Sequence, residues 1–273
     1  MATPHICITC GTQFAETAAA PERCPICEDE RQYVNWSGQR WTSLEALREG
    51  HRNVLREEEP GLTGIVTEPS FAIGQRALLL QTAGGNILWD CLSLIDEATV
   101  DAVRSRGGLT AIAISHPHYY SSLVEWSRAF GSVPVYLHAD DREWIMRPDP
   151  AIRCWEGEAS RLGEGVTLIR CGGHFPGASV LHWAGGAGGR GALLTGDTLQ
   201  VVPDRRHVSF MRSYPNLIPL SGAAVRRILG AVRPYAFDRI YGAFTGRTIP
   251  RAAKEAVARS ADRYANAIER EPA

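Results

Sequence analysis

The sequence is poor in lysine, in excess charge and in long apolar runs. Lys254 is its only lysine, and the 29 basic residues are balanced by 30 acidic ones, for a formal net charge of −1. Nucleic acids and anionic membranes attract proteins through excess positive charge, so the composition favours neither partner. No apolar run approaches the roughly 20 residues that span a bilayer. Nor does a charged stretch after Met1 lead into an apolar one. We therefore expect a cytoplasmic protein without signal peptide or membrane anchor.

The seven cysteines do not form the even set of a disulfide framework. Cys7 and Cys10 make one C-x-x-C pair, and Cys24 and Cys27 make a second pair after thirteen residues. Four thiolates at this spacing can surround one tetrahedral Zn²⁺ at about 2.3 Å from each sulfur. A segment this short has too little core to fold alone, and metal binding would therefore drive its folding. The pattern resembles zinc ribbons and rubredoxin. Its role is structural, or it docks a partner or covers an active site.

Length and composition indicate one main domain with a small appendage. The chain has 273 residues, of which 44% are hydrophobic and 22% charged, as in ordinary globular proteins. The abundance of Arg, Ala and Gly is typical of a bacterial, GC-rich genome. We predict a four-cysteine segment over residues 1–35, a linker and helix over 36–60, and the main domain over 61–273.

Periodicity predicts a mixture of helices and strands. Thr42 and Glu45 have the spacing of a capping box, and we expect a helix from there toward Arg56. Short β-branched runs and glycine turns predict strands at 64–67, 77–81, 86–90, 110–114, 133–137, 166–169, 180–183, 192–195 and 237–241. Helices are expected at 95–104, 122–130, 140–146, from 221 onward, and again near the end of the sequence, where Val257 and Ile268 share one face.

Two histidines follow the predicted strand at residues 110–114. His116 and His118 flank Pro117, which stiffens the loop between them. On extended backbone, side chains two residues apart point the same way. Both imidazoles are therefore expected to reach one metal ion.

Two further motifs downstream can complete such a site. His174 follows two glycines, where the backbone can pass close to an ion. Asp197 ends the apolar strand at residues 192–195 in the sequence T-G-D. By contrast, we interpret His138, which follows a strand, and His182, which lies within one, as structural histidines.

The ordered set of an H-x-H pair, a lone G-H and a strand-terminal G-D resembles the metallo-β-lactamase superfamily over roughly residues 61–246. The resemblance implies an α+β fold, the αββα sandwich, and a metal site of His116, His118 and His174 with Asp197 beside it. It also implies that Asp90, which ends a strand, supports the metal loop without binding the metal. The alternative for Asp90 is a plain turn residue.

The sequence departs from the family at its second metal position. The family's first motif is H-x-H-x-D-H, and its last two ligands are replaced here by Tyr120 and Ser121. The family's late histidine is also missing from residues 240–246. We therefore expect one metal ion in the main domain.

Three histidines and an open position are typical of a catalytic zinc site. Neutral imidazoles leave the ion its full charge, which can lower the pKa of a bound water to about 7. Asp197 would bind the metal or hold the water. Tyr120, or else Tyr119, would stabilise a developing oxyanion in place of the second metal. Packing beside the site is an equally good interpretation of Tyr120.

Residues 201–220 follow Asp197 and are expected to wall the pocket. In this segment His207, Arg212 and Tyr214, with Arg205 and Arg206, can hold an anionic or carbonyl-bearing small molecule, and Tyr119 of the histidine motif is a further substrate-binding candidate. The alternative is an ordinary solvated loop. His207 is also a candidate to replace one lost metal ligand.

Three functions remain open. The first is a mononuclear zinc hydrolase acting on an ester, thioester, lactone or amide. The second is an iron dioxygenase of the same superfamily, acting on a thiol-derived substrate, with iron on two histidines and Asp197. The third is a binding protein whose site has decayed. A nuclease ranks lower, because the chain lacks basic excess and the aspartate that such nucleases use.

Overall fold

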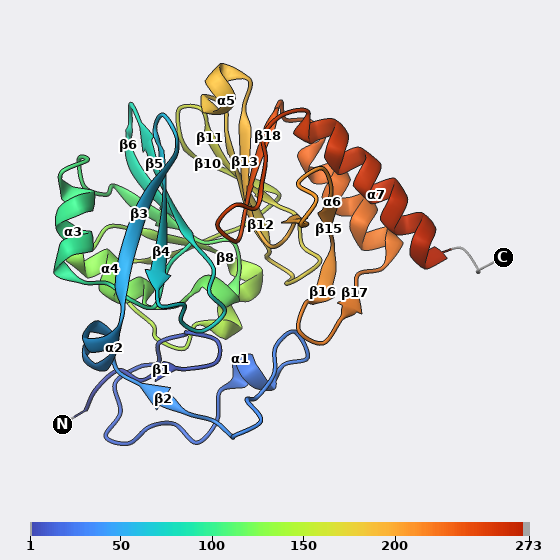
Figure 1. Cartoon of the computed structure of the whole chain (residues 1–273). Coiled ribbons are helices and arrows are strands. Elements are labelled where there is room, and N and C mark those ends of the chain that lie inside the picture. Colours follow the sequence, from blue (N-terminus) through green and yellow to red (C-terminus); the bar gives the residue numbers. More distant parts are fainter. Residues whose placement is uncertain (1, 270–273) are drawn as a thin grey trace. The chain divides into compact units, whose positions relative to one another are not determined.

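The computed structural model describes residues 2–269 and divides into two compact units (Figure 1). Unit 1 comprises Met1–Leu137 and Asp141–Cys154, and unit 2 comprises His138–Asp140 and Trp155–Ala273. Within the described residues, no helix combines the length and the hydropathy that crossing a bilayer requires.

Unit 1 is built on a seven-stranded sheet. Its strands are β3 (Arg52–Glu59), β4 (Leu62–Glu68), β5 (Ala77–Thr82), β6 (Gly85–Trp89), β7 (Ala111–Ala113), β8 (Val135–His138) and β9 (Ile152–Trp155), in that spatial order. The first four pair antiparallel, and β6, β7 and β8 run parallel. All three residues of β7 are buried, as expected for a central parallel strand. The histidine loop therefore leaves the carboxyl end of a buried strand.

Strand β3 replaces the helix that the sequence predicts toward Arg56. The helix α2 covers only Leu44–Gly50, and its N-cap is Ser43, whose side chain accepts from the backbone N–H of Ala46, so the predicted cap at Thr42 is wrong by one residue. Residues 52–59 pair with β4 instead. Arg56 forms a cross-strand ion pair with Glu68. Tertiary pairing here overrides the helix preference of the Glu-rich run.

The remaining helices of unit 1 follow the predicted pattern. Helix α3 (Glu97–Arg104) is capped by Asp96, whose carboxylate accepts from the backbone N–H of Thr99. Helix α4 (Leu123–Ala129) follows the histidine loop, and 3-10 turns occupy Pro117–Tyr119 and Ala139–Trp144. Thus the helix expected at 140–146 is a shorter 3-10 segment.

The N-terminal part of unit 1 has little regular structure. It contains β1 (Ile6–Cys7), β2 (Trp41–Thr42) and the one-turn helix α1 (Pro25–Glu28). Strands β1 and β2 pair antiparallel, so the first knuckle is tied to the end of the predicted linker. Its small core consists of the four cysteines with Phe14 and Ile26, against which Trp41, Trp144 and Met146 pack. Trp36, which lies in the predicted linker, is fully exposed.

Unit 2 is built on a six-stranded sheet. Its spatial order is β10 (Ala159–Gly163), β11 (Val166–Arg170), β12 (Ser179–Trp183), β13 (Ala192–Gly196), β18 (Arg239–Gly242) and β19 (Thr248–Ile249). Pairing is antiparallel except between β13 and β18. Neither β9 nor β10 is predicted by the sequence, because both are half-exposed and carry charged residues.

Two helices cover the core of unit 2. Helices α6 (Gly222–Val232) and α7 (Ala253–Glu269) lie side by side (Figure 1) and bury Val225, Ile228 and Val257 against the sheet residues Leu193 and Ile240. The segment after Asp197 forms two small hairpins, β14 (Gln200–Val201) with β15 (Val208–Ser209) and β16 (Met211–Ser213) with β17 (Ile218–Pro219). The glycine-rich turn before β13 is the short helix α5 (Gly186–Gly189).

Candidate metal centres

His116 and His118 lie on the loop that follows β7. The sequence predicts an extended backbone through both histidines. In the structure His116 is extended, with φ −169°, but Pro117 begins a 3-10 turn. Proline suits that position because its fixed φ matches the turn and its missing N–H would have no partner there. Both rings are buried, and their centroids lie 5.3 Å apart. The 3-10 turn, and not an extended backbone, therefore places the two imidazoles close together.

Hydrogen bonds from unit 1 fix this loop. Asp90 accepts at 2.8 Å from the backbone N–H of Ser115, which confirms its predicted supporting role. The hydroxyl of Ser115 lies 2.9 Å from Nδ1 of His116. Gln75 donates from Nε2 to the carbonyl of His118 at 2.7 Å. With Nδ1 engaged, Nε2 is the atom of His116 that would bind a metal ion.

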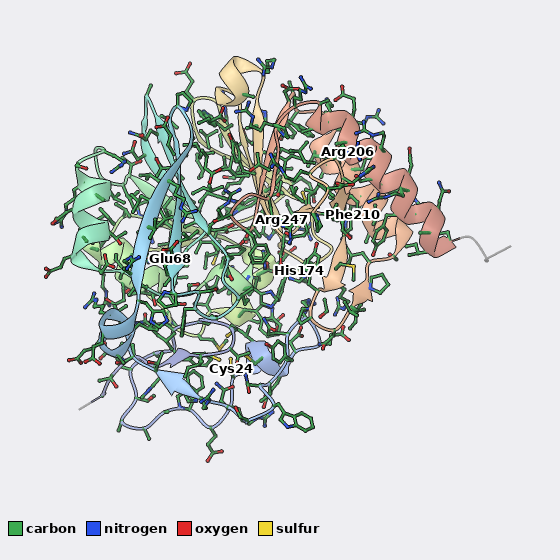
Figure 2. All side chains as sticks on the ribbon, in the orientation of Figure 1. Cys24, Glu68, His174, Arg206, Phe210 and Arg247 are labelled. Atoms are coloured by element: carbon green, nitrogen blue, oxygen red, sulfur yellow. The ribbon has the colours of Figure 1, made fainter. Side chains whose placement is uncertain are left out.

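His174 lies in unit 2 on the loop between β11 and β12 (Figure 2). Its ring is buried and Nδ1 donates to the carbonyl of Met211 at 3.2 Å, which makes Nε2 the ligand atom. The preceding Gly173 has φ +85°, and a Cβ there would lie 2.8 Å from Leu220 Cδ1 and 3.0 Å from Ile228 Cδ1. The left-handed backbone favours glycine, and an added Cβ would force the ends of these two side chains to shift. The glycine before His174 is therefore a packing requirement.

Asp197 follows β13 in unit 2. Burial raises the pKa of its carboxyl, an effect that nearby His174 opposes. Tyr214 donates its hydroxyl to the backbone carbonyl of Asp197 at 2.9 Å, and its ring centroid lies 6.1 Å from that of His174. Burial and then the charge of Asp197 raise the pKa of Tyr214, so this phenol stays protonated as a donor. A cation beside Asp197 would favour its ionised form.

Unit 1 holds two of the four predicted ligands, His116 and His118, and unit 2 holds the other two, His174 and Asp197. His116, His118, His174 and Asp197 each offer one ligand atom, and these atoms all lie within 4.8 Å of one another. Ligands of a tetrahedral zinc ion with bonds of about 2.1 Å stand roughly 3.4 Å apart. Three imidazoles and a carboxylate suit Zn²⁺ or Fe²⁺. Within residues 2–269 the only other such group is formed by the cysteines.

The four cysteines of the N-terminal segment also converge. Cys7 Sγ lies 3.6 Å from Cys27 Sγ, and Cys10 Sγ lies 3.7 Å from Cys24 Sγ. Sulfurs around a tetrahedral zinc ion stand about 3.8 Å apart, so these spacings match the predicted Zn²⁺ site. Hydrogen bonds from Cys10 and the other two thiols lower the pKa of Cys7, and Gln39 donates to its Sγ at 3.2 Å. These contacts therefore favour the thiolate form of Cys7.

The two tyrosines of the histidine loop are buried. The ring of Tyr119 meets that of His116 edge to face, with centroids 5.2 Å apart. Tyr120 donates its hydroxyl to the carbonyl of Asp141 at 3.3 Å, and burial raises its pKa. This bond corresponds to the packing role that the sequence left open for Tyr120. A role as oxyanion donor stays a prediction.

The predicted substrate-binding residues occupy the two hairpins after Asp197. The ring of His207 pairs with Asp204 at 2.6 Å and is not a member of the four-ligand group. Arg212 is half-buried in β16. Together with Tyr214, these residues are all held by unit 2, and their role toward a substrate stays a prediction.

His138 and His182 have backbone partners, as expected for structural histidines. His138 bonds to the carbonyl of Gly157 and to the backbone N–H of Asp140. His182 donates to the carbonyl of Ala236 at 2.8 Å. Both rings thus have backbone partners outside the four-ligand group.

Sequence reasoning missed the residues that orient the ligands. Gln75 lies 43 positions before His118, and no local pattern connects them. Ser115 could have been noticed, because a hydroxyl beside a candidate ligand can fix its ring. Met211 acts through its carbonyl, which no side-chain pattern reveals.

Comparisons with known proteins agree with this arrangement. The family model described as the metallo-β-lactamase superfamily matches residues 72–263. The uncharacterized protein YmaE of Bacillus subtilis (strain 168) is 51% identical over 269 residues, which cover 98% of this chain and 97% of that protein. Among solved structures, the DIM-1 metallo-β-lactamase has a TM-score of 0.61 at 14% identity, with 80% of this chain and 98% of that chain covered. TTHA1623 in a di-iron-bound form has a TM-score of 0.52 at 23% identity, with coverages of 72% and 97%.

Proposed function

Because the chain belongs to the metallo-β-lactamase superfamily, we propose that it is a metal-dependent hydrolase with a mononuclear centre. His116, His118 and His174 are the proposed ligands, and Asp197 lies beside them to bind the metal or to hold the water. The observation that carries the proposal is the convergence of these four donor atoms within 4.8 Å. Zn²⁺ is the metal we propose, because imidazole and carboxylate oxygen are its ordinary ligands outside thiolate sites.

The second metal of the family has no equivalent ligands here. Tyr120 and Ser121 replace an aspartate and a histidine of the family motif, and residues 240–246 contain no histidine. Tyrosine and serine bind divalent metals poorly in their neutral forms, and burial raises the pKa of Tyr120. We therefore infer one ion at this centre.

A zinc ion held by these residues would supply polarisation of a carbonyl and activation of water at neutral pH. The residues of the chain perform the remaining work. The ring of His174, fixed through Nδ1 by the carbonyl of Met211, presents Nε2. Asp197 beside the metal can accept the proton that leaves the attacking water. Tyr214 holds the backbone of Asp197 in register for that transfer.

The substrate we propose is a small carbonyl compound: an ester, thioester, lactone or amide. Arg212 and His207 lie on the hairpins that follow Asp197 and would hold an anionic group of such a substrate. The four buried thiols of the four-cysteine segment favour a reducing compartment, so we place the protein in the cytoplasm.

One alternative has a specific observation in its favour. Two histidines and one carboxylate form the ligand set of mononuclear iron oxygenases, and the four-ligand group contains such a set. The fold relative TTHA1623 is described in a di-iron-bound form, although at 23% identity the likeness concerns fold alone. Zinc bound at the histidine centre would favour the hydrolase. Iron bound there, and not at the cysteine site, would favour the dioxygenase.

A substrate screen tests the proposal. Zinc-loaded protein is assayed against a panel of esters, thioesters, lactones and amides, with His174→Ala as the matched loss-of-ligand variant and His182→Gln as the control histidine outside the group. Hydrolysis that is retained by His182→Gln and lost by His174→Ala supports the proposal. Activity that both variants retain, or a histidine centre without metal, contradicts it.

A further inference from the structure

The four-cysteine segment contacts the histidine loop directly, within unit 1. We define the knuckle loop as residues 10–13 and the histidine loop as residues 115–122. The backbone N–H of Gln13 donates to the carbonyl of Ser121 at 3.0 Å. Cys10 begins the knuckle loop, and Ser121 follows His118 by three residues. One hydrogen bond thus connects a cysteine ligand with a histidine ligand through two short stretches of backbone.

A second contact runs through Ser93. Its hydroxyl donates to the carbonyl of Gly11 at 2.7 Å, while its own carbonyl accepts from the hydroxyl of Ser122 at 2.8 Å. Gly11 has φ +83°, and a Cβ there would lie 2.5 Å from Ser93 Oγ. The knuckle loop is therefore pressed against Ser93, and Ser93 holds the other end of the histidine loop.

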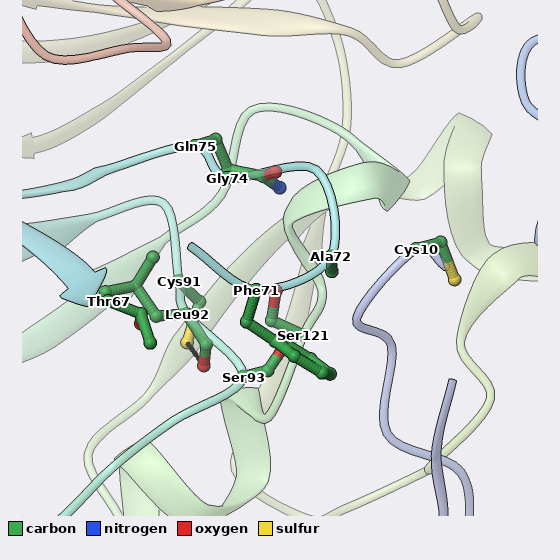
Figure 3. A pocket seen from close by; sticks show the side chains of 10 residues that line it. All are labelled: Cys10, Thr67, Phe71, Ala72, Gly74, Gln75, Cys91, Leu92, Ser93 and Ser121. Atoms are coloured by element: carbon green, nitrogen blue, oxygen red, sulfur yellow. Dashed lines mark hydrogen bonds between the residues drawn. The ribbon is translucent and has the colours of Figure 1, made fainter. Parts of the chain in front are cut away.

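Little space separates the two loops. Cys10, Ser93 and Ser121 line a cavity of about 20 Å³, which is room for roughly one water molecule (Figure 3). Ser121 is buried and has φ +41°, a conformation that its surroundings must maintain. In so closely packed a region, a displacement of the knuckle loop moves the histidine loop as well.

The knuckle loop has few other means of keeping its shape. The N-terminal segment has two-residue strands and a one-turn helix, and its core is the cysteines themselves with a few neighbours. A segment of this kind depends on its metal for order. Loss of that metal would therefore release Gln13 and Gly11, the two residues that contact the histidine loop and Ser93.

We propose that the metal ion of the four-cysteine segment positions the histidine loop, so that the histidine centre binds its own metal tightly only when the cysteine site is loaded. Gln13 is the main positioning residue, acting through Ser121 on His118. The inference rests on the proposed function for the metal at the histidine centre. It assigns the four-cysteine segment a regulatory role inside unit 1.

The chain offers a matched pair of variants for the test. Gln13→Pro removes the N–H that bonds to Ser121. The paired bridge between Ile6 and Gln13 uses the N–H groups of Cys7 and Phe14, so it is retained. Gln13→Ala keeps the N–H and loses only the side-chain amide, which accepts from Arg147. The difference between the two variants therefore isolates the backbone bond.

Two readouts are measured on full-length protein with a loaded cysteine site. The first is the Zn²⁺ affinity of the histidine centre, by competition with a chromophoric chelator. We expect Gln13→Pro to bind about ten-fold more weakly than Gln13→Ala, the lower end of the effect of residues that orient ligands. The second is amide hydrogen exchange over residues 115–122 with the histidine centre empty. We expect faster exchange in Gln13→Pro alone.

The outcomes separate this inference from the proposed function. Equal zinc affinity and equal exchange in the two variants would overturn the positioning role while leaving the hydrolase intact. A wild-type histidine centre that takes no metal would overturn the proposed function, and the exchange readout would still decide whether the loop is positioned. Should Gln13→Pro not fold, Ser93→Ala removes the second contact, and unchanged zinc affinity in that variant contradicts the inference.

Discussion

The two candidate metal centres are built in opposite ways. All four cysteines lie within residues 7–27, and their sulfurs already stand at the spacing of a tetrahedral zinc site. The histidine centre draws its ligands from residues 116–197, from loops that follow separate strands. Local spacing suffices for the first centre, whereas the second exists only once the chain has folded.

Their donor chemistry differs as much as their construction. Four thiolates fill every position of a zinc ion and leave the centre negatively charged, which suits a structural site. Three neutral imidazoles and one carboxylate leave a zinc centre positive, which suits an ion that acts on water or a carbonyl. Under the proposed function, the contrast corresponds to a metal that maintains structure in the cysteine site and a metal that performs chemistry in the histidine site.

Removing a histidine ligand should have the largest effect on activity. His174→Ala is expected to lower hydrolysis by about 100-fold or more, because loss of a ligand removes the metal that the reaction requires. Elemental analysis should find one metal per chain fewer than in the wild type, with the cysteine-bound ion retained. His182→Gln, which alters a histidine outside the group, should keep both ions. Loss of both ions in His174→Ala would show that the two centres fold as one.

Removing a cysteine ligand should have the largest effect on stability. Cys24→Ser is expected to release the cysteine-bound ion and to destabilise unit 1 by several kcal/mol, since the metal contributes folding free energy directly. Thermal unfolding followed by circular dichroism measures the loss. Cys154→Ser, which changes a cysteine outside the cluster, is the control. Equal melting temperatures for Cys24→Ser and the wild type would mean that the segment folds without its metal.

The loop glycine before His174 should matter through packing. Gly173→Ala is expected to cost about 2–4 kcal/mol, because φ is +85° and the new Cβ would lie 2.8 Å from Leu220 Cδ1. Gly165→Ala is the matched control, since φ is +70° but the nearest contact is an ordinary 3.6 Å. Denaturant unfolding should show a cost of only about 1–2 kcal/mol for the control. Equal costs would contradict the packing argument.

Mild acid should weaken unit 2 through His182. Burial lowers the pKa of this ring below its ordinary value of 6.5. The unfolded chain therefore takes up a proton near pH 6.5, before the folded protein does, so stability falls as the pH decreases below that value. His182→Gln should flatten the dependence of the free energy of unfolding between about pH 6.5 and 5. An unchanged slope would show that another group dominates.

The last variant is expected to leave the metal content unchanged. Phe244→His restores a histidine to the region where the family has its late ligand, but Tyr120 and Ser121 still supply no suitable donor. Metal content should stay at its wild-type value. An additional ion in this variant would mean that the second metal position survives with fewer ligands than we infer.

The sequence predicted what local spacing determines. The four-cysteine cluster, the four ligands of the histidine centre and the supporting role of Asp90 follow from motifs, and the predicted fold class, the α+β sandwich of the superfamily, is confirmed by the family match and the structural neighbours. The 3-10 turn at Pro117–Tyr119 was missed because both an extended chain and a turn can bring two histidines together.

The failures have tertiary causes. Residues 52–59 carry three consecutive glutamates that favour a helix, yet they form a strand because β4 offers an open edge and Arg76 a partner for Glu58. The contact of Gln13 with Ser121 joins residues 108 positions apart and involves only backbone atoms. No pattern of side chains can reveal such a bond.

The central claim is that the chain holds two metal ions in centres of different chemistry. Metal content per chain, determined by elemental analysis on protein purified without chelator or added metal, tests it most directly. We predict two zinc ions per chain, one lost in Cys24→Ser when the cysteine site is broken and one lost in His174→Ala. A single ion that disappears with the cysteines would leave the histidine centre empty and contradict the account.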